Sequence, residues 1–150
     1  MEIGKEIKQT VKFSSEYHKM SVNILYTASW LNVLHATQLK PFGITSQQFN
    51  ILRILRGQHP NPATINMLIE RMIDKSSNAS RLVDRLQEKL LADRCTCDSD
   101  KRSVNVRITD KGLEVLKLIE LENVSFENEL KTLSKDEAAE LSRLLDKLRG

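Results

Sequence analysis

The spacing of apolar residues changes once along this chain, and that change restricts the folds it can adopt. Across SSNASRLVDRLQEKLLADR, residues 76–94, apolar side chains recur at the spacing of one helical face. That face consists of Ala79, Leu82, Val83, Leu86 and Leu90. The segments ADRCTC and SVNVRIT then alternate between apolar and polar residues, as strands do. A helix with one buried face is therefore expected to lead into a two-stranded hairpin, with DSDKR as the polar connection and Val104, Val106 and Ile108 on its apolar side.

The first half of the chain is otherwise predicted to be helical. A charged stretch over residues 1–16 predicts a loosely held helix, and helical spacing continues from Tyr17 to Leu39. KPFGIT breaks that helix. Thr45 or Ser46 is the expected cap of the next one, which runs to Gly57. The short segment ATIN, partly β-branched, leads into a brief helix before residue 74.

Three helix starts follow in the second half. Asp74 or Ser76 is expected to cap the amphipathic helix, and TDKG at 109–112 starts another that runs to about Leu130, with Thr109 or Asp110 as its cap. SKDE at 134–137 fits a capping box. The last helix has one apolar face, made of Leu141, Leu144, Leu145 and Leu148.

Composition excludes several classes of protein. At 150 residues the chain predicts a single domain, 1–150, and five glycines with three prolines leave few turns for a many-stranded β fold. No window approaches the roughly 18 apolar residues of a membrane span. MEIGKEIKQT lacks the apolar core of a secretory signal. We therefore expect a cytoplasmic protein without a membrane partner.

No residue pattern indicates catalysis or metal binding. Cys95 and Cys97 lie on the same side of one predicted strand, a poor geometry for a mutual disulfide, so we interpret both as structural. His35 and His59 are too far from them in sequence to give a zinc-ligand spacing. Without a nucleophile–base pair or a phosphate loop, an enzyme is not expected, and no cofactor or metal is predicted.

Positive charge is concentrated in the first three quarters of the chain. The formal net charge is only +3, but residues 1–73 hold eight Lys/Arg against four Asp/Glu, and residues 74–111 hold nine against seven. Residues 112–150 reverse the balance, with six against nine. A polyanionic partner would therefore meet the earlier segments.

The amphipathic helix has an unusually bare outer face at its start. Opposite the apolar stripe lie Ser77, Ser80, Arg81, Asp84 and Arg85. Small hydroxyl and amide side chains would allow this end of the helix to enter a DNA major groove, and basic residues would reach phosphates or guanine. Lys101 and Arg102 on the hairpin tip could follow the backbone into the adjacent minor groove.

The order helix, turn, helix, hairpin predicts a mainly α fold with a small β-hairpin, a winged helix-turn-helix. The predicted DNA-binding residues are Ser76, Ser77, Asn78, Ser80, Arg81, Arg85, Lys101 and Arg102. Each part has a purely structural alternative, because Ser and Asn also cap helices, paired arginines are usually solvated, and DKR is a common polar turn. A winged helix used only for protein–protein contact is the alternative function.

The segments SRLVDRLQEKLLADR and DSDKRSVNVRITDKG resemble the recognition helix and wing of the multiple-antibiotic-resistance regulator (MarR) family, and ITSQQFNILRIL resembles its second helix. The resemblance covers about residues 44–112. It implies a homodimeric transcriptional regulator, expected to be a repressor, on a pseudo-palindromic operator. By the same resemblance Asp100 would orient Arg102, and Arg94 matches the basic residue after the recognition helix. Leu90 departs from the family, which usually has glycine there, so either Leu90 is strained or the helix runs on.

We expect the segments outside the winged lobe to form a dimer interface and an effector pocket. Apolar stripes in residues 1–40 and 113–150 exceed what a winged lobe at 44–112 can bury, so two copies are expected to bury them together, with Leu141, Leu144, Leu145 and Leu148 in the interface. The alternative is packing within one subunit. The resemblance also implies a small phenolic or lipophilic effector, for which Trp30, His35 and Phe42 are candidate pocket residues.

Overall fold

The computed structural model describes residues 2–97, 100–122 and 124–150, and the side chains of these except at 96, 97, 100–103 and 124–126. The elements in chain order are α1 (Ile3–Glu6), α2 (Glu16–Leu39), the 3₁₀ turn η1 (Lys40–Phe42), α3 (Ser46–Gln58), β1 (Ala63–Thr64), α4 (Ile65–Arg71), α5 (Ala79–Glu88), β2 (Ala92–Cys97), β3 (Asp100–Ile108), α6 (Asp110–Glu122), α7 (Val124–Leu130) and α8 (Lys135–Arg149). The mainly helical prediction is confirmed.

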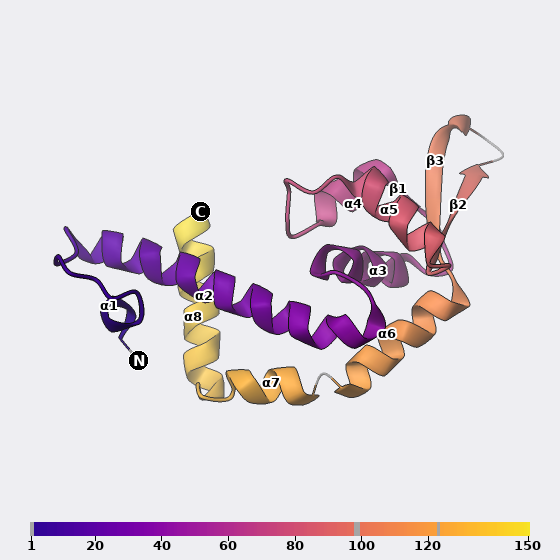
Figure 1. Cartoon of the computed structure of the whole chain (residues 1–150). Helices are drawn as coiled ribbons and strands as arrows, with labels where there is room; N and C mark the ends of the chain where they lie inside the picture. The colour runs from indigo at the N-terminus through magenta and orange to yellow at the C-terminus, as the bar shows by residue number, and fades with distance from the viewer. Residues whose placement is uncertain (1, 98–99, 123) are drawn as a thin grey trace.

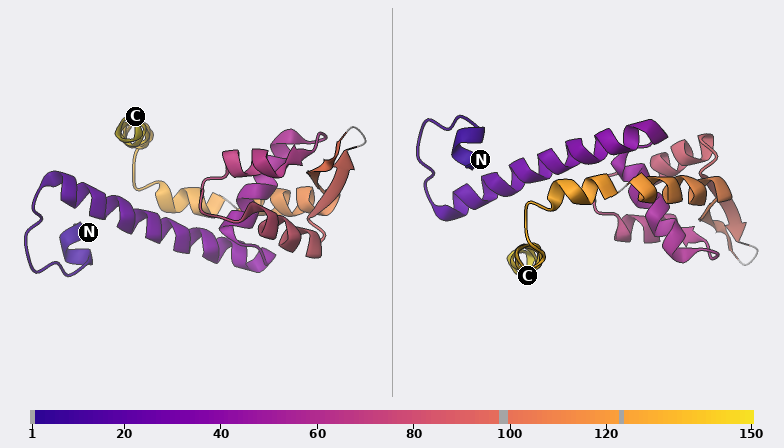
Figure 2. Two further views of the ribbon diagram at one scale, coloured as in Figure 1. Left: turned by 90° about the horizontal axis from the view of Figure 1, so that it is seen from above. Right: turned by 90° about the horizontal axis from the view of Figure 1, so that it is seen from below.

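The molecule consists of a winged lobe and a set of outer helices (Figure 1). The lobe contains α3, α4, α5 and the sheet, and α6 leads away from the base of the hairpin. The long α2 extends beyond the lobe, with α1 beside its start (Figure 1). α8 crosses α2 in the view of Figure 1 but stands clear of it in both views of Figure 2. Among the described residues, no helix combines the length and hydropathy needed to cross a bilayer.

The sheet has three strands, so the predicted two-stranded hairpin was incomplete. β1 pairs with β3 in antiparallel register, Ala63 opposite Val106 and Thr64 opposite Asn105, which gives the order β1-β3-β2. Two residues are too short to show a strand period, so the sequence could not reveal β1. The predicted apolar side of the hairpin was partly wrong, because Val106 and Ile108 are buried whereas Val104 is exposed and Asn105 is buried.

Capping side chains set most helix starts where the sequence predicted them. Thr45, not Ser46, caps α3 in a reciprocal box, with Gln48 N donating to Thr45 Oγ1 at 3.2 Å and Thr45 N donating to Gln48 Oε1 at 3.1 Å. Ser134 and Glu137 form the same box at α8. Thr109 rather than Asp110 caps α6, since Gly112 N donates to its Oγ1 at 3.0 Å.

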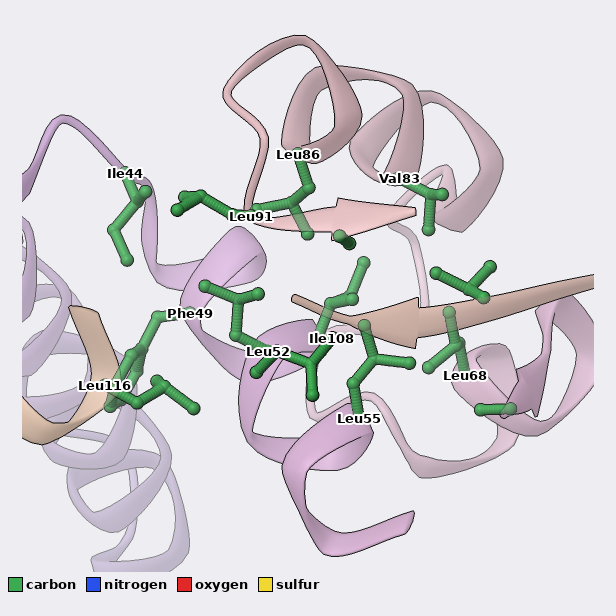
Figure 3. Packing of buried hydrophobic residues seen from close by; sticks show 14 of the residues in the cluster. Ile44, Phe49, Leu52, Leu55, Leu68, Val83, Leu86, Leu91, Ile108 and Leu116 are labelled. Carbon is green, nitrogen blue, oxygen red and sulfur yellow. The ribbon is translucent and has the colours of Figure 1, made fainter. Parts of the chain in front are cut away.

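The hydrophobic core lies where α3, α4 and α5 pack against the sheet (Figure 3). Leu52 and Leu55 of α3 meet Leu68 of α4 and Val83 and Leu86 of α5, and all five are buried. Because the predicted stripe of α5 faces this core, the opposite face of that helix is turned to solvent.

Leu90 was wrongly assigned to the buried stripe. α5 ends at Glu88, and Leu90 has a φ of 61°, the left-handed conformation that a glycine would adopt without strain. Its side chain is 63% exposed, and the next residue, Leu91, is buried in its place. Of the two alternatives for Leu90, strain is the one observed.

A close approach at Gly112 joins α6 to this turn. A Cβ atom on Gly112 would lie 2.3 Å from the carbonyl oxygen of Leu91. Thr109 Oγ1 donates to the carbonyl oxygen of Leu90 at 2.7 Å, and Thr109 N donates to that of Leu91 at 3.2 Å. The base of the hairpin is thereby fixed between α5 and α6.

Candidate nucleic-acid interface

The turn before α5 is built around one carboxylate. Asp74 accepts hydrogen bonds from the backbone N of Ser76 at 3.0 Å, from Ser76 Oγ at 2.6 Å and from Ser77 Oγ at 2.9 Å. The bonds from the Ser76 and Ser77 hydroxyls, and that from the Ser76 amide, hold the pKa of the Asp74 carboxyl below its usual range. Both hydroxyl hydrogens are therefore engaged within the turn.

Asn78 is the N-cap of α5, so the predicted caps Asp74 and Ser76 were wrong. Its Oδ1 accepts from Arg81 N at 3.0 Å, and the helix begins at Ala79. Ser76 and Ser77 thus precede the helix and belong to the turn. Sequence spacing favoured the earlier cap because Asp and Ser rank with Asn as N-cap residues.

The outward face of α5 is polar and mostly basic. Ser80, Arg81, Asp84 and Arg85 are all exposed, opposite the buried Ala79, Val83 and Leu86. Arg85 pairs with Glu88 at 2.8 Å in an exposed pair, which is worth little and leaves Arg85 available. Among the residues with described side chains, the Arg81 guanidinium has no ion-pair partner within 4.0 Å.

Arg94 joins the wing to α5, a contact that sequence reasoning missed. From β2, its Nη2 donates to Asp84 Oδ1 at 2.6 Å, to Ser80 Oγ at 3.0 Å and to the Ser80 carbonyl oxygen at 3.3 Å. The pair neutralises Asp84, as Arg85 pairs with the other acidic side chain on this face of α5, Glu88. The contact crosses the turn between helix and strand, so no periodic spacing signals it. Only the resemblance had pointed to Arg94.

The wing residues have a described backbone only. Asp100, Lys101 and Arg102 open β3, which pairs with β2 from Asp100 opposite Cys97 to Ile108 opposite Ala92. Their side chains lie outside those that the structure describes. The predicted contacts of Lys101 and Arg102, and the orientation of Arg102 by Asp100, therefore stay predictions. Cys95, on β2, is a free thiol.

The residues predicted for an effector pocket do not share one described hollow. Trp30 lines a hollow of about 290 Å³ with Glu6, Tyr26 and Thr27. His35 is partly buried on α2, and this burial lowers the pKa of its imidazole. Phe42 packs against the core of the lobe.

Comparison with known proteins identifies the fold. A sequence model of the MarR family matches residues 42–103. MgrA, an HTH-type transcriptional regulator of Staphylococcus aureus, is 30% identical over 110 residues, which are 73% of this chain and 72% of MgrA. The chain belongs to the MarR family. It is a winged helix-turn-helix, DNA-binding transcriptional regulator.

Two further regulators are similar to this chain, one in sequence and the other in sequence and fold. PecS of Dickeya dadantii (strain 3937), also an HTH-type transcriptional regulator, is 26% identical over 109 residues, 71% of this chain and 66% of PecS. The crystal structure of a C80S variant of MarR from E. coli, complexed with operator DNA, superposes with a TM-score of 0.79 at 27% identity and covers 92% of this chain and 99% of that chain. The predicted family and fold are confirmed.

Proposed function

We propose that this MarR-family protein is a homodimeric repressor of a pseudo-palindromic operator, with α5 in the major groove and the β2–β3 wing against the adjacent backbone. The observation that carries the proposal is the exposed polar face of α5, opposite the buried Ala79, Val83 and Leu86. A helix anchored in this way presents its outer side chains rigidly, so binding orders little of the protein. The relative of the same fold that was crystallised with operator DNA supports DNA as the partner.

The predicted contact residues have different parts in this proposal. Arg81 and Arg85 are long, basic and exposed, and we assign them to guanine or phosphate. Ser80 keeps a hydroxyl hydrogen to donate, although its oxygen accepts from Arg94. Ser76, Ser77 and Asn78 shape the turn that positions the helix, with Ser76 and Ser77 able to accept a hydrogen bond from a base amino group. Lys101 and Arg102 on the wing would bind the backbone.

The proposed homodimer rests on apolar surface that one subunit does not cover. On α8, all of whose residues are described, no residue is buried, and Leu141, Leu144 and Leu148 are exposed with Leu145 half-buried beside them. Apolar side chains of α2, including Leu25 and Val33, are exposed as well. A two-fold dimer would bury both sets and place its recognition helices about 34–36 Å apart on DNA.

The proposal includes a small effector that binds beside α2. Trp30 offers an exposed aromatic surface on α2, which fits a phenolic or lipophilic compound. His35 and Phe42 could join it only if the outer helices and the lobe close on the compound together. Isothermal titration with salicylate tests this, and heat of binding that Trp30→Ala removes would support it.

Selection of bound sequences from a random duplex pool tests the function. The proposal predicts enrichment of a two-fold motif whose half-sites are about one DNA turn apart, with affinity that falls steeply as salt rises. Enrichment of a motif without two-fold symmetry would contradict the dimer. Failure to enrich any sequence at low salt would contradict DNA recognition and favour the protein-contact alternative.

A further inference from the structure

Ile73 is the most exposed large apolar side chain among the described residues. It lies in the turn between α4 and α5 and is 87% exposed, whereas its neighbour Met72 is 1% exposed in the core. Single exposed apolar residues are common on proteins and need no function. Ile73 differs because of how its backbone is held and what lies beside it.

The backbone at Ile73 is fixed from both sides. Its N–H donates to Asn50 Oδ1 of α3 at 2.9 Å, 23 residues away in sequence. Met72 N donates to the carbonyl oxygen of Leu68 at 2.9 Å, and Asp74 then binds both Ser76 and Ser77. A β-branched side chain on such a backbone has few conformations to lose on binding.

The position of Ile73 places it at the edge of the candidate interface. It precedes the N-cap Asn78 by five residues, and the turn projects from the lobe at the end of α5 opposite the wing (Figure 1). Arg71 and Lys75 flank it in sequence together with Glu70 and Asp74, and the Asp74 carboxylate accepts from the Ser76 and Ser77 hydroxyls of the turn. Because the turn leads directly into the helix that carries the exposed Arg81 and Arg85, we take DNA as the occupant of this surface.

We propose that Ile73 contacts the 5-methyl group of a thymine at the edge of the site read by α5, and so selects thymine at one position of each half-site. The C5-methyl group of thymine is the distinctive apolar feature of the base-pair edges in the major groove. The inference rests on the proposed function, because it requires α5 to enter that groove.

The test pairs a side-chain deletion with a methyl deletion. The duplex is the sequence selected by the full-length protein, and each thymine in turn is replaced by deoxyuridine, which lacks only the methyl group. Fluorescence anisotropy gives the Kd of wild type, Ile73→Ala and Ile69→Ala for every duplex. Ile69 is the matched control, since it is an exposed isoleucine one helical turn earlier. Both substitutions are at exposed positions, so the variants should fold.

At one thymine per half-site, deoxyuridine should weaken wild-type binding about fourfold, the value of one buried methyl group. Ile73→Ala should weaken binding to the unmodified duplex by at least as much and lose sensitivity to that thymine. Ile69→Ala should keep it. The inference is overturned if Ile73→Ala binds like wild type or responds to every deoxyuridine as wild type does. If the wild type selects no duplex, the proposed function itself fails, which is a different result.

Discussion

The winged lobe and the outer helices place the same residue type in opposite environments. In the lobe, Leu52, Leu68 and Leu86 have no exposed surface, whereas Leu141 and Leu144 of α8 are each 47% exposed. The lobe has a continuous buried core within one subunit, so it is expected to keep its shape alone. The outer helices leave an apolar stripe uncovered, which is typical of an interface between copies. In the proposed function, the lobe therefore recognises DNA and the outer helices form the dimer.

The largest effect on operator binding is expected on α8, whose exposed leucines we assign to the dimer interface. Leu144→Asp places a charge in the proposed interface, so it should shift the protein to monomers and weaken operator binding by about 100-fold or more, because two half-sites no longer act together. Analytical ultracentrifugation and anisotropy measure the two changes. Glu140→Gln, on an exposed part of the same helix, is the control. A Leu144→Asp variant that remains dimeric would place the interface elsewhere.

Next in size is a change inside the lobe. Gly112→Ala puts a Cβ atom against the Leu91 carbonyl oxygen and should lower the free energy of unfolding by about 1–3 kcal/mol. Urea denaturation measures it. Gly57→Ala, in α3 with open space around it, should instead gain up to about 1 kcal/mol. Equal stabilities of the two variants would show that the hairpin base is not held as tightly as described.

A smaller effect is expected at the contact between wing and recognition helix. Arg94→Gln should free the Asp84 carboxylate on the DNA-facing surface and weaken operator binding about tenfold through repulsion of phosphate. Adding Asp84→Asn should recover most of that loss. Anisotropy on all three variants gives the coupling. If the double variant binds as weakly as Arg94→Gln alone, Arg94 acts on DNA directly and not through Asp84.

The smallest expected effect concerns the strained turn. Leu90→Gly removes a left-handed leucine, which costs about 1–2 kcal/mol, but gains chain freedom on unfolding worth about 0.5–1 kcal/mol. The free energy of unfolding should rise by about 0.5 kcal/mol, measured by thermal denaturation. Gln87→Gly, in the last turn of α5, should lose about 1 kcal/mol. A loss at both positions would mean that the exposed Leu90 side chain makes a stabilising contact.

The sequence could predict the features of the lobe and of the outer helices that depend on neighbouring residues. Periodicity identified the buried face of α5, because Val83 and Leu86 follow helical spacing. It also identified β3, because Val106 and Ile108 follow the two-residue spacing of a strand. Capping chemistry located Thr45 and Ser134, because a Ser or Thr three residues before Gln or Glu can form a reciprocal capping box with it at the start of a helix. These signals are local, and local signals are visible in a sequence.

Contacts between distant segments could not be predicted from spacing. β1 is recognisable only from its pairing with β3, and the Arg94–Asp84 contact depends on the angle between a strand and a helix. The prediction of the α5 cap was wrong for another reason, because Asp74, Ser76 and Asn78 all have side chains that can cap a helix. Asp74 and Ser76 bond to each other in the turn, which leaves Asn78 as the cap.

Recognition of the operator by the outward face of α5 is tested most directly at Arg81. Anisotropy titrations of wild type, Arg81→Ala and the surface control Arg149→Ala on the selected duplex should be compared across a salt series. Arg81→Ala is expected to weaken binding by about 1–3 kcal/mol per subunit, whereas the control should match wild type. Full operator affinity in a folded Arg81→Ala protein would contradict it.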